Sequence, residues 1–122
     1  MIAYVTLGSN NLDRSVAFYD AVLAELGAKR IAEMDRMKMY GTEAGGPMLG
    51  VCRPYNGKPA EPGNGTMVAV TAGSREQVDK LHAKALSLGA ADEGAPGERM
   101  PGFYAAYFRD LDGNKFCVCV MG

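Results

Sequence analysis

Cysteine thiols are the most reactive side chains that the sequence places close together. Cys117 and Cys119 are separated by one residue in an apolar segment, so a strand there would turn both thiols to the same face. Thiolates favour soft cations such as copper(I) or zinc, and such sites usually recruit three or four ligands. A third thiol could come only from Cys52. Two interpretations stay open: a soft-metal site completed by Cys52, or small apolar side chains that fill space in a strand.

The remaining candidate side chains are one histidine and two cations. His82 lies in the middle of a predicted helix, and we interpret it as a surface or boundary residue of that helix. One imidazole cannot replace a set of metal ligands. Arg109 and Lys115 flank a predicted turn, where they could attract an anionic group or simply be solvated charges. Lys115 is also two residues from Cys117, and a nearby positive charge favours the thiolate form of a nucleophilic cysteine.

Composition limits the class of protein that carries these residues. The chain has 122 residues, of which 48% are hydrophobic and 22% charged, with a formal net charge of −1. These values are typical of one globular domain with a proper core. No basic run is present, so we expect no binding to nucleic acid or to a membrane. Three cysteines and the absence of a signal-peptide pattern before Leu7 predict a cytoplasmic protein.

An internal repeat organises the elements. Val5–Ser9 is repeated as Val70–Ser74, and Leu26–Ala28 as Leu88–Ala90. Between these anchors, each half has apolar residues at helical spacing. We expect Asn11 to cap the first helix, and Ser74 with Gln77 to form a capping box on the second. Gly27 and Gly89 have the left-handed conformational freedom that ends a helix.

Three short strands are predicted after each helix. They lie near 29–34, 38–43 and 47–53 in the first half, and near 91–93, 103–109 and 115–121 in the second. The order is therefore β-α-β-β-β twice, an α+β fold in which helices cover one face of each sheet. We expect a single domain over 1–122, with a first module at 1–54, a linker at 55–65 and a second module at 66–122.

The last two strands are expected to form a hairpin around Asp110–Asn114, whose residue types suit a tight turn. Symmetric pairing about this turn would place two sets of side chains on opposite faces. The face against the helix would carry Phe108, Phe116, Val118 and Val120. The other would carry Ala105, Tyr107, Arg109, Lys115, Cys117 and Cys119, a mixed surface suited to a pocket wall.

Several segments resemble one known family. Met1–Gly8, Leu12–Ser15 and Ala17–Tyr19 are similar to the opening of glyoxalase, bleomycin-resistance and extradiol-dioxygenase-like proteins, the vicinal oxygen chelate superfamily. Gly63–Thr66 and Tyr104–Asn114 resemble its short bacterial, lactoylglutathione-lyase-related branch. The resemblance covers nearly the whole chain and implies two βαβββ modules whose mixed sheet curves into a cup.

The resemblance also implies where a metal would be held. Members of the family hold a divalent metal with histidines on the first strand of each module and an acid on the last strand, and here these positions fall on Tyr4, Met67 and Cys117. A fourth acid, where members have one, would fall at Met48–Gly50. None of these side chains is a good ligand for a hard cation. We therefore expect no metal and no other cofactor.

Three functions remain open on this basis. The first is metal-free binding of a small organic molecule by Tyr4, Met67, Tyr107 and Cys117, with Arg109 near an anionic group. The second is a divergent lyase or isomerase of the glyoxalase kind, with unknown catalytic residues. The third is assembly: a homodimer is expected from the resemblance, and methionines such as Met34, Met37 and Met39 suit an interface or a permissive pocket. The sequence leaves open whether the cup closes within one chain or across two.

Overall fold

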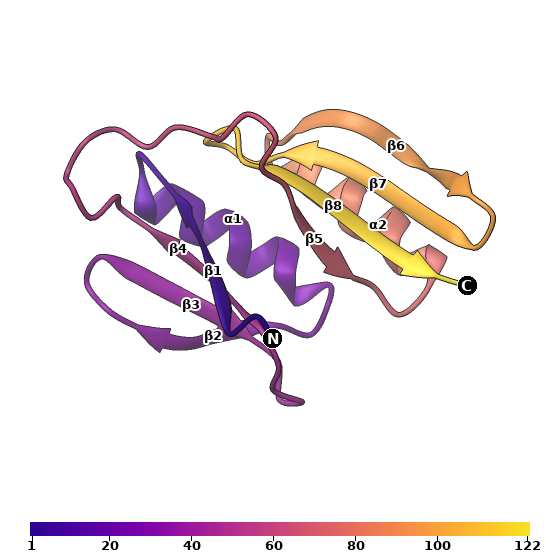
Figure 1. Ribbon diagram of the computed structural model, residues 1–122, viewed down its shortest axis with the longest axis horizontal. Helices are drawn as coiled ribbons and strands as arrows, with labels where there is room; N and C mark the ends of the chain where they lie inside the picture. The colour runs from indigo at the N-terminus through magenta and orange to yellow at the C-terminus, as the bar shows by residue number, and fades with distance from the viewer. The chain divides into compact units, whose positions relative to one another are not determined.

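A strand, a helix and three further strands follow one another in each half of the computed structural model, which describes residues 1–122 (Figure 1). The first half contains β1 (Tyr4–Gly8), α1 (Leu12–Ala24), β2 (Lys29–Glu33), β3 (Met37–Gly41) and β4 (Met48–Cys52). The second contains β5 (Val68–Thr71), α2 (Arg75–Ser87), β6 (Ala91–Met100), β7 (Phe103–Arg109) and β8 (Lys115–Met121). The predicted α+β order is confirmed. The chain divides into two compact units, Met1–Glu61 and Pro62–Gly122, which are described separately below.

The helix ends follow the expected signals. The Asn11 side chain accepts a hydrogen bond from the amide of Arg14, and the Ser74 hydroxyl accepts one from the amide of Gln77. The Gln77 side chain in turn accepts a hydrogen bond from the amide of Gly73, just before the cap. Beyond each helix, Gly27 and Gly89 adopt φ of 75° and 103°, the left-handed conformation that glycine tolerates best. Neither helix is long and apolar enough to cross a membrane.

The first unit packs α1 against a four-stranded sheet of order β1-β4-β3-β2, in which β1 and β4 are parallel. Tyr19 and Tyr40 lie with ring centroids 6.2 Å apart between helix and sheet. The buried Tyr40 hydroxyl donates to Asp20 Oδ1 at 2.8 Å and lies 3.2 Å from the Val16 carbonyl, which ties β3 to α1. We call the face of this sheet that points away from α1 the first open face; strand alternation assigns to it Tyr4, Thr6, Gly8, Met37, Met39, Met48, Gly50 and Cys52.

The second unit repeats this plan with the order β5-β8-β7-β6 (Figure 1). The predicted symmetric hairpin is confirmed, because Phe108 pairs with Phe116 and Arg109 with Lys115. The rings of Phe108 and Phe116 stack 5.4 Å apart on the helix side, and both are buried. We call the face that points away from α2 the second open face; it includes Ala69, Ala105, Tyr107, Arg109, Lys115, Cys117 and Cys119.

The strand after α2 is much longer than expected. The sequence analysis placed it near 91–93, whereas β6 runs from Ala91 to Met100. The sequence did not reveal residues 94–100 as strand, because Gly94, Pro96 and Gly97 interrupt the usual strand pattern. β6 accommodates them because it is an edge strand paired only with β7, and its pairing has irregularities at 92–94, 94–97 and 98–100.

The interpretation of His82 as a surface or boundary residue was wrong. Its side chain is buried on the sheet-facing side of α2, with its ring centroid 6.5 Å from that of Phe108. Its Nε2 lies 3.1 Å from Asp92 Oδ1, and this carboxylate at the start of β6 gives the buried imidazole a polar partner. His82 therefore belongs to the packing between α2 and the sheet.

Candidate functional site

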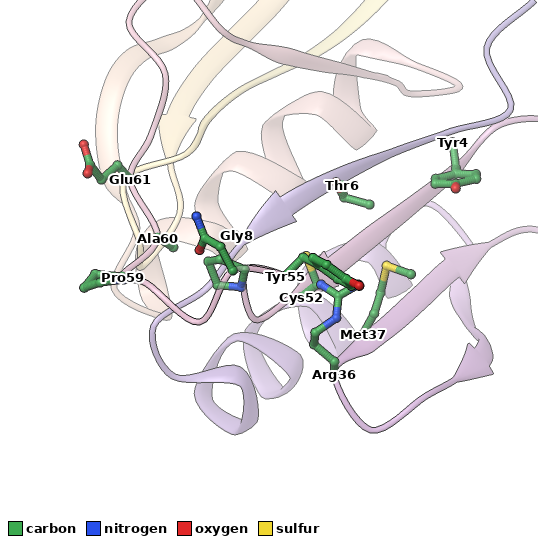
Figure 2. A pocket seen from close by; sticks show the side chains of 12 residues that line it. Tyr4, Thr6, Gly8, Arg36, Met37, Cys52, Tyr55, Pro59, Ala60 and Glu61 are labelled. Carbon is green, nitrogen blue, oxygen red and sulfur yellow. The ribbon is translucent and has the colours of Figure 1, made fainter.

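A pocket of about 570 Å³ lies on the first open face (Figure 2). β1 and β4 form one side of it, the start of β3 forms another, and the segment after β4 folds back to close it. Its volume is in the range of pockets that hold small organic ligands. It is lined by Tyr4, Thr6, Gly8, Arg36, Met37, Cys52, Pro54, Tyr55, Asn56, Pro59, Ala60 and Glu61.

The segment after β4 is held against β1 by one side chain. Asn10 Nδ2 donates to the Ala60 carbonyl at 3.1 Å, and the Ala60 amide donates to Asn10 Oδ1 at 2.7 Å. Gly8 allows this close approach, because a Cβ built there would lie only 2.9 Å from the Ala60 Cβ. The side-chain amide of Asn10 therefore holds this pocket wall in place, and Gly8 leaves room for it because it has no side chain.

Thioethers cover the sheet beside the pocket. A Cβ on Gly50 would lie 2.8 Å from the Met39 Sδ and 3.2 Å from the Met37 Sδ, so both sulfur atoms rest above the backbone of β4. Met39 is buried, and Met37 lines the pocket. Methionine is flexible and polarisable, which suits a surface that adapts to different guests.

An arginine stacked on a tyrosine provides the polar and aromatic part of the pocket. The Arg36 guanidinium carbon lies 5.3 Å from the centroid of the Tyr55 ring, and Figure 2 shows the two groups side by side near Met37. Arg36 Nη1 donates to the Arg53 carbonyl at 2.7 Å, which fixes the guanidinium. The Tyr55 ring is 90% exposed. Glu61 adds a carboxylate at the other end of the pocket, away from Tyr4.

The predicted site residues are divided between the two units. Tyr4 lines the pocket of the first unit. Tyr107 and Cys117 are register partners on the second open face, and Ala69 lies opposite Cys117 on the other side. Met67 immediately precedes β5 and is 45% exposed. In the second unit, the structure brings together Tyr107 and Cys117, with Arg109 two pairs further along the hairpin, opposite Lys115.

Arg109 is already engaged by a carboxylate. Its Nε donates to Glu93 Oε1 at 2.8 Å, and its Nη1 donates to the Gly113 carbonyl at 2.9 Å. It is half-buried and therefore differs from a freely solvated turn residue. Any guest that binds Arg109 would have to share it with Glu93.

The thiol of Cys117 is held in its neutral form. Burial raises its pKa to about 11, with a further contribution from Cys119 beside it. Burial also raises the pKa of Tyr107, and the proximity of Cys117 adds to this effect. Because a thiolate is the form that attacks electrophiles and binds soft cations, this environment disfavours both roles at neutral pH. All three cysteines are free thiols.

The metal implied by the family resemblance does not fit the residues at its expected positions. Tyr4 is an exposed phenol, Met67 carries a thioether, and Cys117 is a buried thiol with a raised pKa. Hard divalent cations need carboxylate, imidazole or carbonyl donors. No group of three or more His, Cys, Asp or Glu side chains is arranged to hold a metal ion.

Sequence reasoning missed most of the pocket wall. Tyr55, Pro59 and Ala60 were treated as linker, and Arg36 was not singled out. Arg99 was also missed, although its guanidinium lies 5.4 Å from the Tyr107 ring on the second open face. Two signals pointed to this wall: the family position at Tyr4, and the alternation of Met37 and Met39 on one strand face.

Comparisons with known proteins agree over nearly the whole chain. A family model described as Glyoxalase/Bleomycin resistance protein/Dioxygenase superfamily matches residues 1–118. A crystal structure of a glyoxalase/bleomycin resistance protein from Albidiferax ferrireducens T118 is 37% identical with a TM-score of 0.92, covering 100% of this chain and 99% of that chain. No curated protein matches the sequence.

Two more distant structures share the fold. Lactoylglutathione lyase from Agrobacterium tumefaciens is 22% identical with a TM-score of 0.70, covering 98% of this chain and 92% of that chain. A glyoxalase-related enzyme from Fulvimarina pelagi is 20% identical with a TM-score of 0.78, covering 98% of this chain and 87% of that chain. At these identities, the similarity concerns the fold alone.

Proposed function

Because the chain belongs to the Glyoxalase/Bleomycin resistance protein/Dioxygenase superfamily, we propose that it binds a small organic molecule on the open faces of its sheets without a metal. The observation that carries this proposal is the pocket of about 570 Å³ on the first open face. The pocket is complete within the first unit and includes Tyr4, the residue at the first expected metal-ligand position. Met67, Tyr107, Cys117 and Arg109 are the ligand-binding residues that we propose in the second unit.

The pocket lining suggests what the guest looks like. Tyr4 and Tyr55 offer aromatic faces, Met37 offers a thioether, and the prolines offer apolar contact. The Arg36 guanidinium and the Glu61 carboxylate can orient polar groups at separate places. We therefore propose a guest with a flat or aromatic part and polar substituents.

A lyase of the glyoxalase kind is the alternative. Such a reaction needs a base that removes a proton next to a carbonyl and an electrophile that stabilises the resulting oxyanion. Within the pocket, Glu61 is the only carboxylate and no histidine is present. No arrangement of residues here specifically favours this chemistry, so binding is the function we propose.

Binding can be tested with two probes suggested by the names of related proteins, bleomycin and S-lactoylglutathione. We expect at least one to raise the melting temperature in proportion to its occupancy. Tyr55→Ala and Arg36→Gln should each weaken its Kd about tenfold, because each removes a stacking or charged contact worth about 1–2 kcal/mol. Isothermal titration calorimetry measures the Kd, and Lys84→Gln, which removes an exposed charge of α2 in the second unit, serves as the control.

Two results would contradict the proposal. One is unchanged affinity in both pocket variants. The other is stoichiometric nickel, zinc, manganese or iron in protein purified without an affinity tag, with probe binding lost when the metal is removed. Conversion of methylglyoxal and glutathione to S-lactoylglutathione by the purified protein would favour the lyase.

Homodimer formation and a cytoplasmic location complete the proposal. Large apolar side chains are exposed in both units, including Ile31 (48%), Met100 (61%) and Met121 (75%), and a second copy of the chain could cover them. The free thiols of Cys52, Cys117 and Cys119 fit a reducing compartment.

A further inference from the structure

Two cations from neighbouring strands flank the ring of Tyr107 on the second open face. The Arg99 guanidinium carbon, from β6, lies 5.4 Å from the ring centroid, and the Lys115 ammonium, from β8, lies 5.7 Å from it. β7 lies between these two strands, so the tyrosine contacts one cation from each neighbouring strand. The ring attracts both cations, but the cations repel each other.

The position of Arg99 depends on two glycines of β6. A Cβ on Gly97 would lie 2.9 Å from Arg99 Nη1, and a Cβ on Gly94 would lie 3.3 Å from Arg99 Nη2 and 3.1 Å from Tyr107 Cδ2. The guanidinium therefore folds back over strand positions that have no side chain. Arg99 Nη2 donates to the Ala95 carbonyl, which fixes it there. Gly97 pairs with Ala105 of the second open face, so strand alternation places Arg99, two residues further on, at the same face.

The positive charge of this cluster is not balanced. Neither Arg99 nor Lys115 forms an ion pair with a carboxylate, whereas Glu93 is paired with Arg109 and Glu98 with Arg75. The two other ionisable groups at the cluster, Tyr107 and Cys117, have raised pKa values and stay neutral at neutral pH. An anion bound at this cluster would reduce the repulsion between the cations and gain charged hydrogen bonds.

We propose that Arg99 and Lys115, both of which contact the Tyr107 ring, form a binding site for a small oxyanion, the carboxylate or phosphate group of a small molecule. The site lies entirely in the second unit and uses no residue of the pocket lined by Tyr4 and Tyr55. It shares Tyr107 with the proposed ligand-binding residues of the second unit, so it rests on the proposed function there and deepens it by naming an anionic class of ligand.

The site can be tested on the full chain with inorganic phosphate and benzoate as probes. We expect one of them to shift the ring signals of Tyr107 saturably in NMR spectra of tyrosine-labelled protein, with Tyr107→Phe assigning the signals. Arg99→Gln and Lys115→Gln should each weaken this binding about tenfold. Lys84→Gln removes an exposed charge from α2 and should leave it unchanged. Gly97→Ala, which displaces the guanidinium but keeps its charge, should weaken binding severalfold.

The results distinguish a phosphate ligand from a carboxylate ligand, and they test the anion site independently of the first-unit pocket. Saturation by phosphate alone assigns the site to phosphate groups, and saturation by benzoate assigns it to carboxylates. If neither probe shifts Tyr107, or if Arg99→Gln and Lys115→Gln bind as tightly as the unmodified chain, the inference is wrong. Arg99→Gln should leave the affinity of the first-unit pocket for bleomycin or S-lactoylglutathione unchanged, so either proposal can fail without the other.

Discussion

Two glycines leave the space that the pocket wall and the Arg99 side chain occupy. Gly8 lets the Ala60 segment reach β1, and Gly97 lets the Arg99 guanidinium fold over β6. Neither residue has a positive φ, so what matters is the missing Cβ rather than backbone freedom. Gly8 and Ala60 are 52 positions apart in the sequence, whereas Gly97 and Arg99 are two positions apart. The sequence pattern identified neither contact, because it says which face a residue occupies but not what approaches that face.

The cysteines should differ in reactivity for a reason that lies in each residue's surroundings. Cys119 is partly exposed, whereas Cys52 and Cys117 are buried, and burial raises the pKa of Cys117 to about 11. Iodoacetamide at about pH 8 should therefore modify Cys119 first and Cys117 more than tenfold more slowly, because the thiolate is the reactive form. Mass spectrometry of timed digests measures both rates, and protein unfolded in urea provides the equal-rate control. Faster labelling of Cys117 in the folded protein would contradict the burial argument.

At the scale of elements, the order, the caps and the final hairpin follow from the sequence, and β6 does not. Amphipathic spacing and the caps at Asn11 and Ser74 are local signals, so both helices could be predicted closely. The extension of β6 to Met100 depends on pairing with β7, a long-range effect that overrides the strand-breaking residues Pro96 and Gly97. His82 was misjudged because its burial depends on long-range contacts with Phe108 and Asp92, which the helical pattern of α2 does not report.

The contact between α2 and β6 should make stability depend on pH in the acid range. The amide of Gly94 donates to Asp92 Oδ1 and, together with the His82 side chain, lowers the pKa of this carboxyl from its ordinary value of 3.8. A carboxyl whose pKa is lower in the folded state stabilises the fold above the unfolded pKa, and this contribution is lost as the pH falls through the lowered value. Asp92→Asn should therefore be less stable than the unmodified chain at pH 7, and the difference should shrink below pH 3.8.

Urea unfolding of both proteins between about pH 2.5 and pH 7 measures this difference. Asp35→Asn is the control, because Asp35 is exposed and its carboxylate contacts only the exposed Arg53. A constant difference between Asp92→Asn and the unmodified chain across the range would show that the charge of Asp92 is not what stabilises this contact.

At the scale of the whole molecule, family and fold class could be predicted from a few segments, but the pocket could not. The family opening at Met1–Gly8 and the turn at Asp110–Asn114 carry the resemblance, and the comparisons confirm it over residues 1–118. The pocket wall comes from Tyr55–Glu61, a segment without regular structure whose path is set by Asn10 and Gly8. Connections of this kind leave little periodic signal in a sequence.

The state of assembly is the prediction at this scale. Exposed apolar side chains such as Ile31 and Met121 predict that the chain associates, and sedimentation equilibrium should give twice the 12.9 kDa of one chain. The apparent mass should fall toward that of one chain on dilution if the association is reversible. A mass of 12.9 kDa at every concentration would contradict the proposed homodimer.

The amide of Asn10 that holds Ala60 has a consequence for how guest preference could change over evolutionary time. Residues 54–61 contribute half of the pocket lining but no strand of the sheet, and the side chain of Asn10, just after β1, binds their backbone at Ala60. Insertions or replacements in this stretch can therefore reshape the cavity without disturbing the register of β1 against β4. A guest that presses on the stretch should in turn slow deuterium uptake at the Ala60 amide, so occupancy could be followed at a single backbone position.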